Sequence, residues 1–161
     1  MNSGQSLLSI GALIIFSLVS INFNSSVLTN TTVEVENKVY LTAFSLADDL
    51  IEEIKQKAFD AATVDFPTTN PASLTGAYSL GHSGSEVYPN FNDIDDFNNF
   101  NKTVSAPHAE NYQITCRVYY VDGDDPDTIV WTQTFYKKVV VTVSSPYLRK
   151  SIILSHIFTL K

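Results

Sequence analysis

The chain carries no ionisable side chain before Glu34, and this feature constrains its fold more than any other. Inside the uncharged stretch, the run Leu7–Phe23 is apolar apart from three serines and one asparagine. A helix of about 17 to 25 apolar residues crosses the hydrocarbon core of a bilayer, so this run lies at the short end of what can span. We interpret Leu7–Phe23 as a helix that crosses a membrane or packs in the core of a filament.

Two alternative interpretations of this run stay open. A secretory signal peptide begins with a basic segment and ends at a small-residue cleavage site. No Lys or Arg precedes the run, and no A-x-A pattern follows it closely. The run could instead be the buried helix of a soluble protein, but the rest of the chain looks too polar to build a large core around it. The sequence therefore favours the spanning interpretation.

Composition excludes several classes of function. The formal net charge is −7, with only 10 Lys and Arg in 161 residues. Affinity for nucleic acid depends on clustered cations, so we expect no nucleic-acid partner. Cys116 is the one cysteine, which excludes an intrachain disulfide. It lies in an alternating apolar run with no activating base nearby in sequence, so we expect a buried, inert thiol.

The motifs of common catalytic and cofactor sites are missing from the sequence. It contains no G-x-G-x-x-G, no P-loop, no C-x-x-C and no H-E-x-x-H. The histidines His82, His108 and His156 are scattered, and their spacing does not predict a shared metal site. We therefore expect a protein that is not an enzyme and that needs no organic cofactor.

The N-terminus, MNSG followed by QSLLSIGALIIFSLVS, carries a specific pattern. It resembles the N-terminus of type IV pilins and of the pseudopilins of type II secretion. Precursors of that family have a leader ending in Gly, then an aromatic or polar residue, Thr or Ser, two aliphatic residues, usually Glu, and a continuous apolar helix. The resemblance implies that residues 1–4 are a leader, that cleavage falls between Gly4 and Gln5, and that Gln5 becomes the N-methylated mature terminus.

The sequence departs from the family pattern at two places. Ser9 stands where the family usually has a glutamate, and the leader lacks the usual Lys or Arg. In the family, that glutamate is thought to neutralise the terminal amine of a neighbouring subunit, and an unpaired buried charge is costly. Some minor subunits at the filament tip also lack it. Ser9 therefore indicates either a minor or initiating subunit or another solution to the charge.

An amphipathic helix is predicted over residues 34–61. Its apolar positions recur at three- and four-residue steps, which is typical of a helix packed on a domain. These positions are Val39, Ala43, Leu46, Ala47, Leu50, Ile54 and Ala58. Beside them, Tyr40, Phe44 and Ile51 form a second apolar line. This second line faces either the core or neighbouring subunits, and we consider its members candidates for lateral contacts.

The helix is expected to be continuous from Gln5 to about Ala61, a rod on the order of 80–90 Å long at 1.5 Å per residue. A domain of roughly 100 residues has a radius of gyration of only about 13 Å. The apolar half of the rod is therefore expected to project from the domain. Near the end of the rod, Glu53 and Lys57 are spaced for an i,i+4 ion pair.

Residues 62–110 are predicted to form a variable loop, because Gly, Ser, Asn and Pro dominate them. Within it, Asp93, Asp95 and Asp96 offer closely spaced carboxylates, as oxygen-ligated calcium would require. The EF-hand pattern fails, but calcium occurs in the equivalent loop of some pseudopilins, so the resemblance supports calcium as one interpretation. Interleaved aromatic residues and Ile94 favour the alternative, a loop pinned to the sheet by its apolar side chains.

Residues 111–161 are predicted to form an antiparallel sheet, because short runs rich in β-branched and aromatic residues alternate with turn signals. The predicted strands are Tyr112–Val121, Ile129–Phe135, Tyr136–Ser144 and Ser151–Leu160. In the third of them, the valines at 139, 141 and 143 share one face. The expected fold class is therefore α+β, with a long N-terminal helix packed on a small antiparallel sheet, and this is also the layout of the family.

The sequence, with the resemblance, predicts a structural subunit of a type IV pilus-like or pseudopilus filament. Residues 5–33 would form the transmembrane or filament-core helix, and residues 34–161 the head. The expected core-packing side chains are Leu7, Leu8, Ile10, Leu13, Ile14, Phe16 and Leu18. The expected partners are further copies or other pilins, with the inner membrane before assembly and an extracellular or periplasmic filament afterwards. The alternative is a single-pass membrane-anchored extracytoplasmic binding domain that does not polymerise.

Overall fold

The computed structural model describes residues 2–84, 86–106 and 109–160. It has an α+β architecture, in which the long helix α1 (Ser3–Ile54) packs on a five-stranded antiparallel sheet. The predicted fold class is therefore confirmed. By its internal contacts the chain divides into two units, Met1–Lys38 and Val39–Lys161. We call the second unit the head, and the last four turns or so of α1 belong to it.

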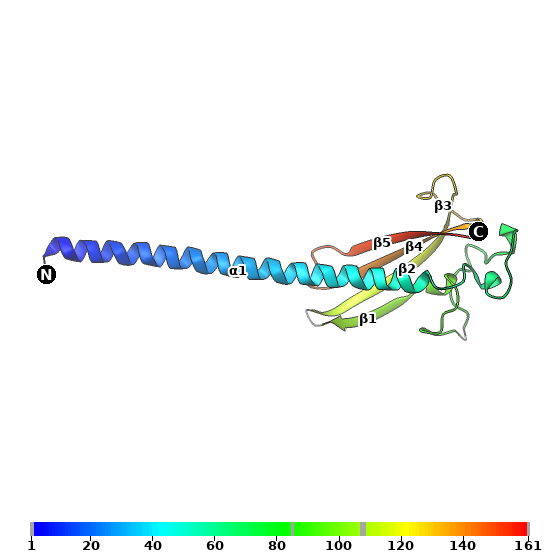
Figure 1. The fold of residues 1–161 in the computed structure, drawn as a ribbon, viewed down its shortest axis with the longest axis horizontal. Coiled ribbons are helices and arrows are strands. Elements are labelled where there is room, and N and C mark those ends of the chain that lie inside the picture. Colours follow the sequence, from blue (N-terminus) through cyan, green and yellow to red (C-terminus); the bar gives the residue numbers. More distant parts are fainter. Residues whose placement is uncertain (1, 85, 107–108, 161) are drawn as a thin grey trace. The chain divides into compact units, whose positions relative to one another are not determined.

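The sheet lies entirely in the head, and its strands pair antiparallel (Figure 1). The strands are β1 (Asn101–Ala106), β2 (Ala109–Val121), β3 (Ile129–Val130), β4 (Tyr136–Ser144) and β5 (Ile152–Thr159). Their spatial order is β1-β2-β4-β5, and the short β3 pairs with the end of β2. The long central strands β2 and β4 thus each have a neighbour on both sides, while β1, β5 and the short β3 lie at edges of the sheet.

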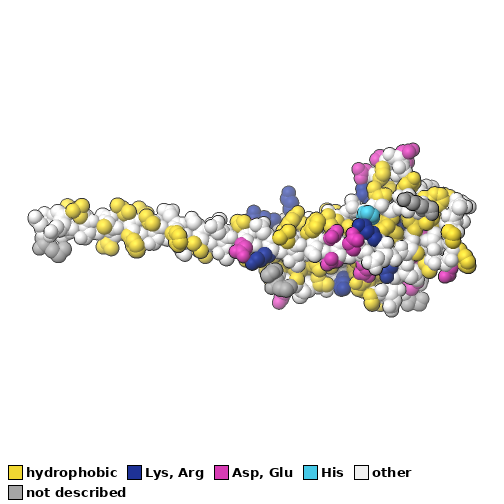
Figure 2. Space-filling view, viewed as in Figure 1, with side chains coloured by type: hydrophobic (Ala, Val, Ile, Leu, Met, Phe, Trp, Pro, Cys, Tyr) yellow, Lys and Arg dark blue, Asp and Glu magenta, His cyan; other side chains and the backbone are white. Residues whose placement is uncertain are grey.

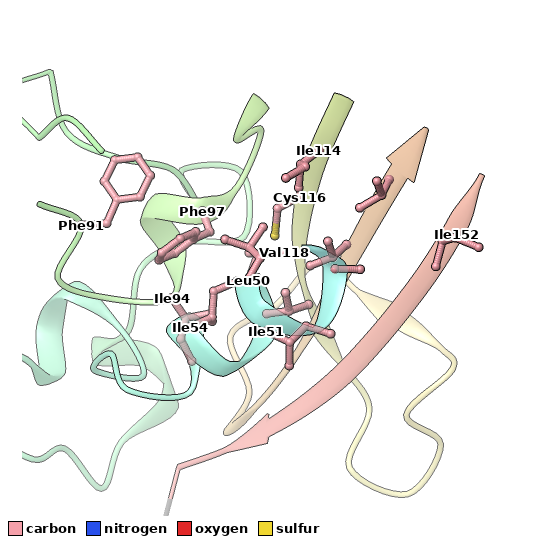
Figure 3. Close-up of a cluster of buried hydrophobic side chains, with 14 of the residues drawn as sticks. Leu50, Ile51, Ile54, Phe91, Ile94, Phe97, Ile114, Cys116, Val118 and Ile152 are labelled. Carbon is pink, nitrogen blue, oxygen red and sulfur yellow. The ribbon is translucent and has the colours of Figure 1, made fainter. Parts of the chain in front are cut away.

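The core of the head forms where α1 crosses the inner face of the sheet. Along β4 every second side chain is buried, so the predicted inward face of valines at 139, 141 and 143 is confirmed. Ala43 and Ala47 on α1 have no exposed surface, and such small side chains let the helix approach the strands closely. Figure 3 shows Leu50 and Ile54 of α1 in one cluster with Val118 of β2 and with Ile94 and Phe97 of the loop before β1.

The single thiol lies in this core, as the sequence predicted. Cys116 on β2 has no exposed surface. Burial raises the pKa of its thiol to about 12, because the thiolate would be far from water. Cys116 is therefore a small apolar packing residue.

The end of α1 differs from the prediction. The helix ends at Ile54, not near Ala61. Beyond it the chain turns, and Ala58 exchanges hydrogen bonds with the segment at Asn92 and Ile94, at 3.1 and 3.0 Å. These hydrogen bonds to a distant segment take the place of further helical ones. The periodicity of apolar residues cannot predict them, because it reports only on local structure.

The predicted Glu53–Lys57 pair was wrong for the same reason. With the helix ended, Lys57 Nζ donates to the carbonyl of Phe91 at 2.7 Å, and Glu53 accepts from the hydroxyl of Tyr88 at 3.1 Å. Both side chains thus hold the loop after α1 to the helix end.

Two strand boundaries also differ from the prediction. The loop predicted over residues 62–110 contains short 3-10 helices and ends at Phe100, because β1 begins at Asn101 and β2 already begins at Ala109. The predicted strand Ile129–Phe135 is limited to the two residues of β3. β1 is polar and mostly exposed, so its strand is defined by pairing with β2 and not by an apolar alternation.

The packing of α1 on the sheet gives a first test of the head. Ile54→Ala is expected to lower the free energy of unfolding of the head by about 2–5 kcal/mol, because Ile54 is fully buried and its truncation leaves a cavity. Leu41→Ala on the same helix is the matched control. Leu41 is 64% exposed, so the change should stay within about 0.5 kcal/mol. Denaturant unfolding in detergent, followed by circular dichroism, measures both, and equal losses would contradict this packing.

Candidate functional site

The first candidate site is the apolar surface of α1 within the N-terminal unit. Leu8 is 77% exposed and Phe16 is 71% exposed. All side chains that the sequence assigned to core packing are likewise exposed, namely Leu7, Leu8, Ile10, Leu13, Ile14, Phe16 and Leu18. Figure 2 shows hydrophobic side chains along this part of the helix, with no Lys, Arg, Asp or Glu among them. An apolar surface of this extent marks a site of contact with protein or membrane.

By length and composition, α1 meets the requirement for crossing a membrane, with a mean hydropathy of 2.1 over its most apolar window. It is the one such helix in residues 2–84, 86–106 and 109–160. None of that window is buried within the chain, so it is not the core helix of the head. A signal sequence near an N-terminus meets the same criterion, so this interpretation stays beside that of an anchor.

Two of the three serines in Leu7–Phe23 donate their hydroxyl protons to the helix itself. Ser9 Oγ donates to the carbonyl of Gln5 at 3.0 Å, and Ser17 Oγ donates to the carbonyl of Leu13 at 2.8 Å. Such bonds to the preceding turn leave no donor to be satisfied by water. These serines are therefore compatible with an apolar environment.

The predicted cleavage site lies in the first turn of α1. Gly4 and Gln5 are both exposed, and a side chain at Gly4 would meet no atom within 4 Å. The N–H groups of Gln5 and Ser6 donate to the carbonyl of Asn2 at 2.9 and 3.4 Å, and the carbonyl of Gln5 accepts from Ser9 Oγ at 3.0 Å. Gly4 is thus exposed, with open space beside its Cα.

The three candidates for lateral contacts are divided by the structure. Tyr40 and Phe44 are 51% and 43% exposed, so they are available to a neighbour. Ile51 is only 5% exposed and lies in the hydrophobic core of the head, so a lateral contact is not open to it and that prediction was wrong. The helical period placed all three on one line, but the sheet covers the helix more widely toward its end.

The second candidate site is a buried ionic cluster in the head, consisting of Asp60, Asp95 and Lys137. Lys137 lies on β4 on the same face as the buried valines, and it has no exposed surface. Its Nζ donates to Asp60 Oδ2 at 2.7 Å and to the carbonyl of Phe59 at 2.8 Å, and it also contacts Asp95 Oδ1. The ammonium therefore joins the segment after α1, the loop before β1 and the sheet.

Asp60 is held as an anion. Its Oδ1 accepts from the N–H of Ala62 and from the N–H and hydroxyl of Thr75, and its Oδ2 accepts from Tyr120 as well as from Lys137. Burial on its own would raise the pKa of this carboxyl. The charge of Lys137 and these hydrogen bonds outweigh burial and lower the pKa to about 2.

Asp95 shares the same ammonium but has the opposite shift. It is 1% exposed, and its Oδ2 has no hydrogen-bond partner among the described residues. Burial, together with the negative charge of Asp60, raises the pKa of Asp95 to about 7 despite the nearby Lys137. The cluster thus pairs one anion that is held by many hydrogen bonds, Asp60, with one carboxyl whose neutral form is favoured by burial, Asp95.

The proposed calcium ligands do not converge on one point. Asp93 Oδ1 accepts from the N–H of Asp95 at 2.7 Å, and Asp96 Oδ2 accepts from the N–H of Asn92 at 3.0 Å. Their carboxylates thus brace their own loop. Within the part of the chain that the structure describes, no three His, Cys, Asp or Glu side chains form a group that could hold a metal. Calcium stays an untested prediction.

Sequence reasoning missed Lys137 and Asp60. A signal for Lys137 exists, because it precedes Val139, Val141 and Val143 at the period of two that defines the inward face. A lysine at an inward position needs a buried anion. No comparable signal picks out Asp60. Of the histidines, His82 is exposed, His156 lies on β5, and His108 is outside the described residues.

Comparison with known proteins adds no family assignment. No protein-family model matches the chain, and no curated protein or solved structure matches it either.

Because Asp93 is buried, we expect the free energy of unfolding of the head to depend on pH. Burial, and then the charge of Asp96, raises the pKa of Asp93 from 3.8 to about 6. Between these values the folded state holds a proton that the unfolded state has released, so the free energy of unfolding falls as pH rises from about 4 to about 6. We expect Asp93→Asn to remove up to about 3 kcal/mol of this fall, since one pKa unit corresponds to about 1.4 kcal/mol.

Denaturant unfolding at several pH values across this window measures the effect. The asparagine keeps an oxygen that can accept from the N–H of Asp95, so the loop geometry is retained. Asp65→Asn, at an exposed position, is the matched control and should follow the wild-type profile. Identical slopes for wild type and Asp93→Asn would contradict the prediction.

Proposed function

We propose that this chain is a structural subunit of a type IV pilus-like or pseudopilus filament, held in the membrane by α1 before assembly. The observation that carries the proposal is the exposed, uncharged apolar surface from Leu7 to Phe23. Water cannot cover this surface without a large free-energy cost, so lipid or other apolar helices must do so. The prepilin-like pattern around Gly4 and Gln5 favours other apolar helices as the cover in the assembled state.

The exchange of lipid for helix contacts is compatible with assembly from a membrane. Lipid tails are as apolar as the side chains of α1, so moving the helix from a bilayer into a bundle loses little apolar burial. The packing of helix against helix then decides whether α1 is more stable in the bundle or in the bilayer. The small side chains of Gly11 and Ala12 on the same helix permit close approach of a neighbour. In this proposal the filament forms by withdrawing α1 from the membrane into contact with its copies.

The head would form the outer layer of the filament. Tyr40 and Phe44 are the exposed aromatic side chains of α1 within the head, and large aromatic residues carry much of the binding energy at protein interfaces. In the proposed filament they contact neighbouring subunits. The proposed location is a membrane before assembly and an extracellular or periplasmic filament afterwards.

Leu13→Glu tests the proposed assembly. A carboxylate in the filament core would be buried without a partner, so we expect filaments in negative-stain images to be lost. The monomer in the membrane keeps the remaining apolar positions and can move the carboxylate toward the interface, so membrane retention should persist. Leu13→Met, which keeps an apolar side chain of similar volume, is the control and should retain filaments. A wild-type protein that stays in the membrane and forms no filament under any condition would instead support the membrane-anchored binding domain.

Processing at Gly4 gives a second test. In the native membrane we expect the mature chain to begin at Gln5 with a methylated amine, because the prepilin-like pattern puts the cleavage after Gly4 and Gly4 is exposed. Gly4→Leu should leave the precursor uncut, since a bulky side chain would occupy the space that a peptidase needs beside the scissile bond. Mass spectrometry of the N-terminal peptide measures both. A mature start beyond Ser20 would establish a removed signal sequence and contradict the proposal.

A further inference from the structure

The buried ionic cluster plays no part in the proposed filament assembly, yet its composition is unusual for a structural ion pair. Two carboxyls share one ammonium, and Asp60, Asp95 and Lys137 are each at most 1% exposed. Burying ions is costly unless every lone pair and proton has a partner. Asp95 Oδ2 has no partner among the described residues, so this part of the cost is not offset.

The geometry places an amine beside a carboxyl carbon in the buried interior of the head. Lys137 Nζ contacts Asp95 Oδ1, which is bonded to the carboxyl carbon Cγ, so the amine lies beside the carbon that it would attack. The rings of Phe59 and Tyr120 lie 4.6 and 5.1 Å from Nζ and exclude solvent from it. The amine and the carboxyl are therefore adjacent and shielded from solvent in the folded protein.

We propose that Lys137 and Asp95 condense to form an intramolecular isopeptide bond, with Asp60 as the catalytic residue that transfers the proton. The bond would join Lys137 Nζ to Asp95 Cγ and release one water molecule. It would link β4 covalently to the loop that precedes β1. The inference goes beyond the proposed function and does not depend on filament assembly.

The reaction balances without any external reagent. The ammonium of Lys137 first gives a proton to Asp95, which leaves a neutral amine beside a neutral carboxylic acid. The Nζ lone pair then attacks Cγ and forms the C–N bond, and the carbonyl electrons move to oxygen. The nitrogen, now positively charged, gives a second proton to Asp60 Oδ2, which lies 2.7 Å from Nζ. Asp60 returns this proton to a departing hydroxyl, and the products are an amide and water.

The two carboxyls are suited to different roles. Asp60 accepts hydrogen bonds from Ala62, Thr75 and Tyr120, which hold it as an anion and make it a poor electrophile. Its fixed position suits transient proton transfer. Asp95 has an open oxygen and is the group that burial favours in the neutral form, as the electrophile must be.

The product removes what makes the present arrangement costly. An amide carries no charge, so the charges of Lys137 and Asp95 disappear together, and Asp60 then depends on the hydrogen bonds from Ala62, Thr75 and Tyr120. One of the two Asp95 oxygens leaves with the water, so a carboxyl with an unpartnered oxygen is replaced by an amide with a single oxygen. The bond would also cross-link residues 42 positions apart in a chain whose single cysteine excludes an intrachain disulfide.

The test is the intact mass of the full-length protein, purified in detergent and denatured before measurement. The wild-type chain should be lighter by one water molecule than its sequence, after allowance for N-terminal processing. Lys137→Met removes the amine and should show no such loss. Lys138→Met is the matched control: Lys138 is the next residue on β4 and pairs instead with the exposed Asp127 at 2.6 Å, so the water loss should remain. Comparing the three masses, each with its own sequence, cancels any N-terminal processing.

Two further variants separate bond formation from folding. Asp95→Asn offers an amide in place of the acid and should form the same bond with loss of ammonia, so its final mass should equal that of the cross-linked wild type. Asp60→Asn cannot accept the proton and should keep its full mass. Tryptic mapping of the wild type should yield one branched peptide that contains Asp95 and Lys137, with no cleavage after Lys137.

The decisive measurement is made on the wild type, so a variant that fails to fold leaves the proposal testable. A wild-type mass without the water loss, with a linear peptide ending at Lys137, would overturn it. Loss of water with a branch at another pair of residues would overturn the assignment to Asp95 and Lys137. Neither result bears on filament formation, which Leu13→Glu tests separately.

Discussion

An apolar helix surface that its own chain does not bury has to be covered by something else, and this requirement dominates the protein. The uncharged part of α1 is exposed from Leu7 through Phe23, and the hydroxyls of Ser9 and Ser17 bond to its own backbone. These two hydroxyls therefore need no polar partner outside the helix. Lipid and sister helices both meet the requirement, and the proposed filament subunit uses one before assembly and the other after it.

Within the head, a second constraint is the lysine on the inner face of the sheet. Lys137 is placed among buried valines, so its ammonium has to find anions in the interior. It finds Asp60 just beyond the end of α1 and Asp95 in the loop before β1. One side chain thus fixes three segments that are distant in sequence. The proposed amide would make one of these links permanent.

Several features of the head could be predicted from the sequence, and others could not. The inward valines of β4, the buried Cys116 and the packing stripe of α1 from Val39 to Ile54 were predicted, because a regular period exposes them directly. Three other features were not predicted correctly: the end of α1, the partners of Glu53 and Lys57, and the burial of Ile51. Each of these depends on a loop or a strand that arrives from elsewhere in the chain, and local periodicity contains no information about that neighbour.

The sequence by itself determined that the N-terminal helix is uncharged and apolar and that the head is α+β, because hydropathy and period are local properties of the chain. Only the tertiary structure decided which polar residues are buried together. Asp60, Asp95 and Lys137 come from three separate segments, and their meeting is set by how the loop after α1 folds against β4. Burial then gives the two carboxyls opposite properties, because the number of hydrogen-bond donors around each one depends on that fold.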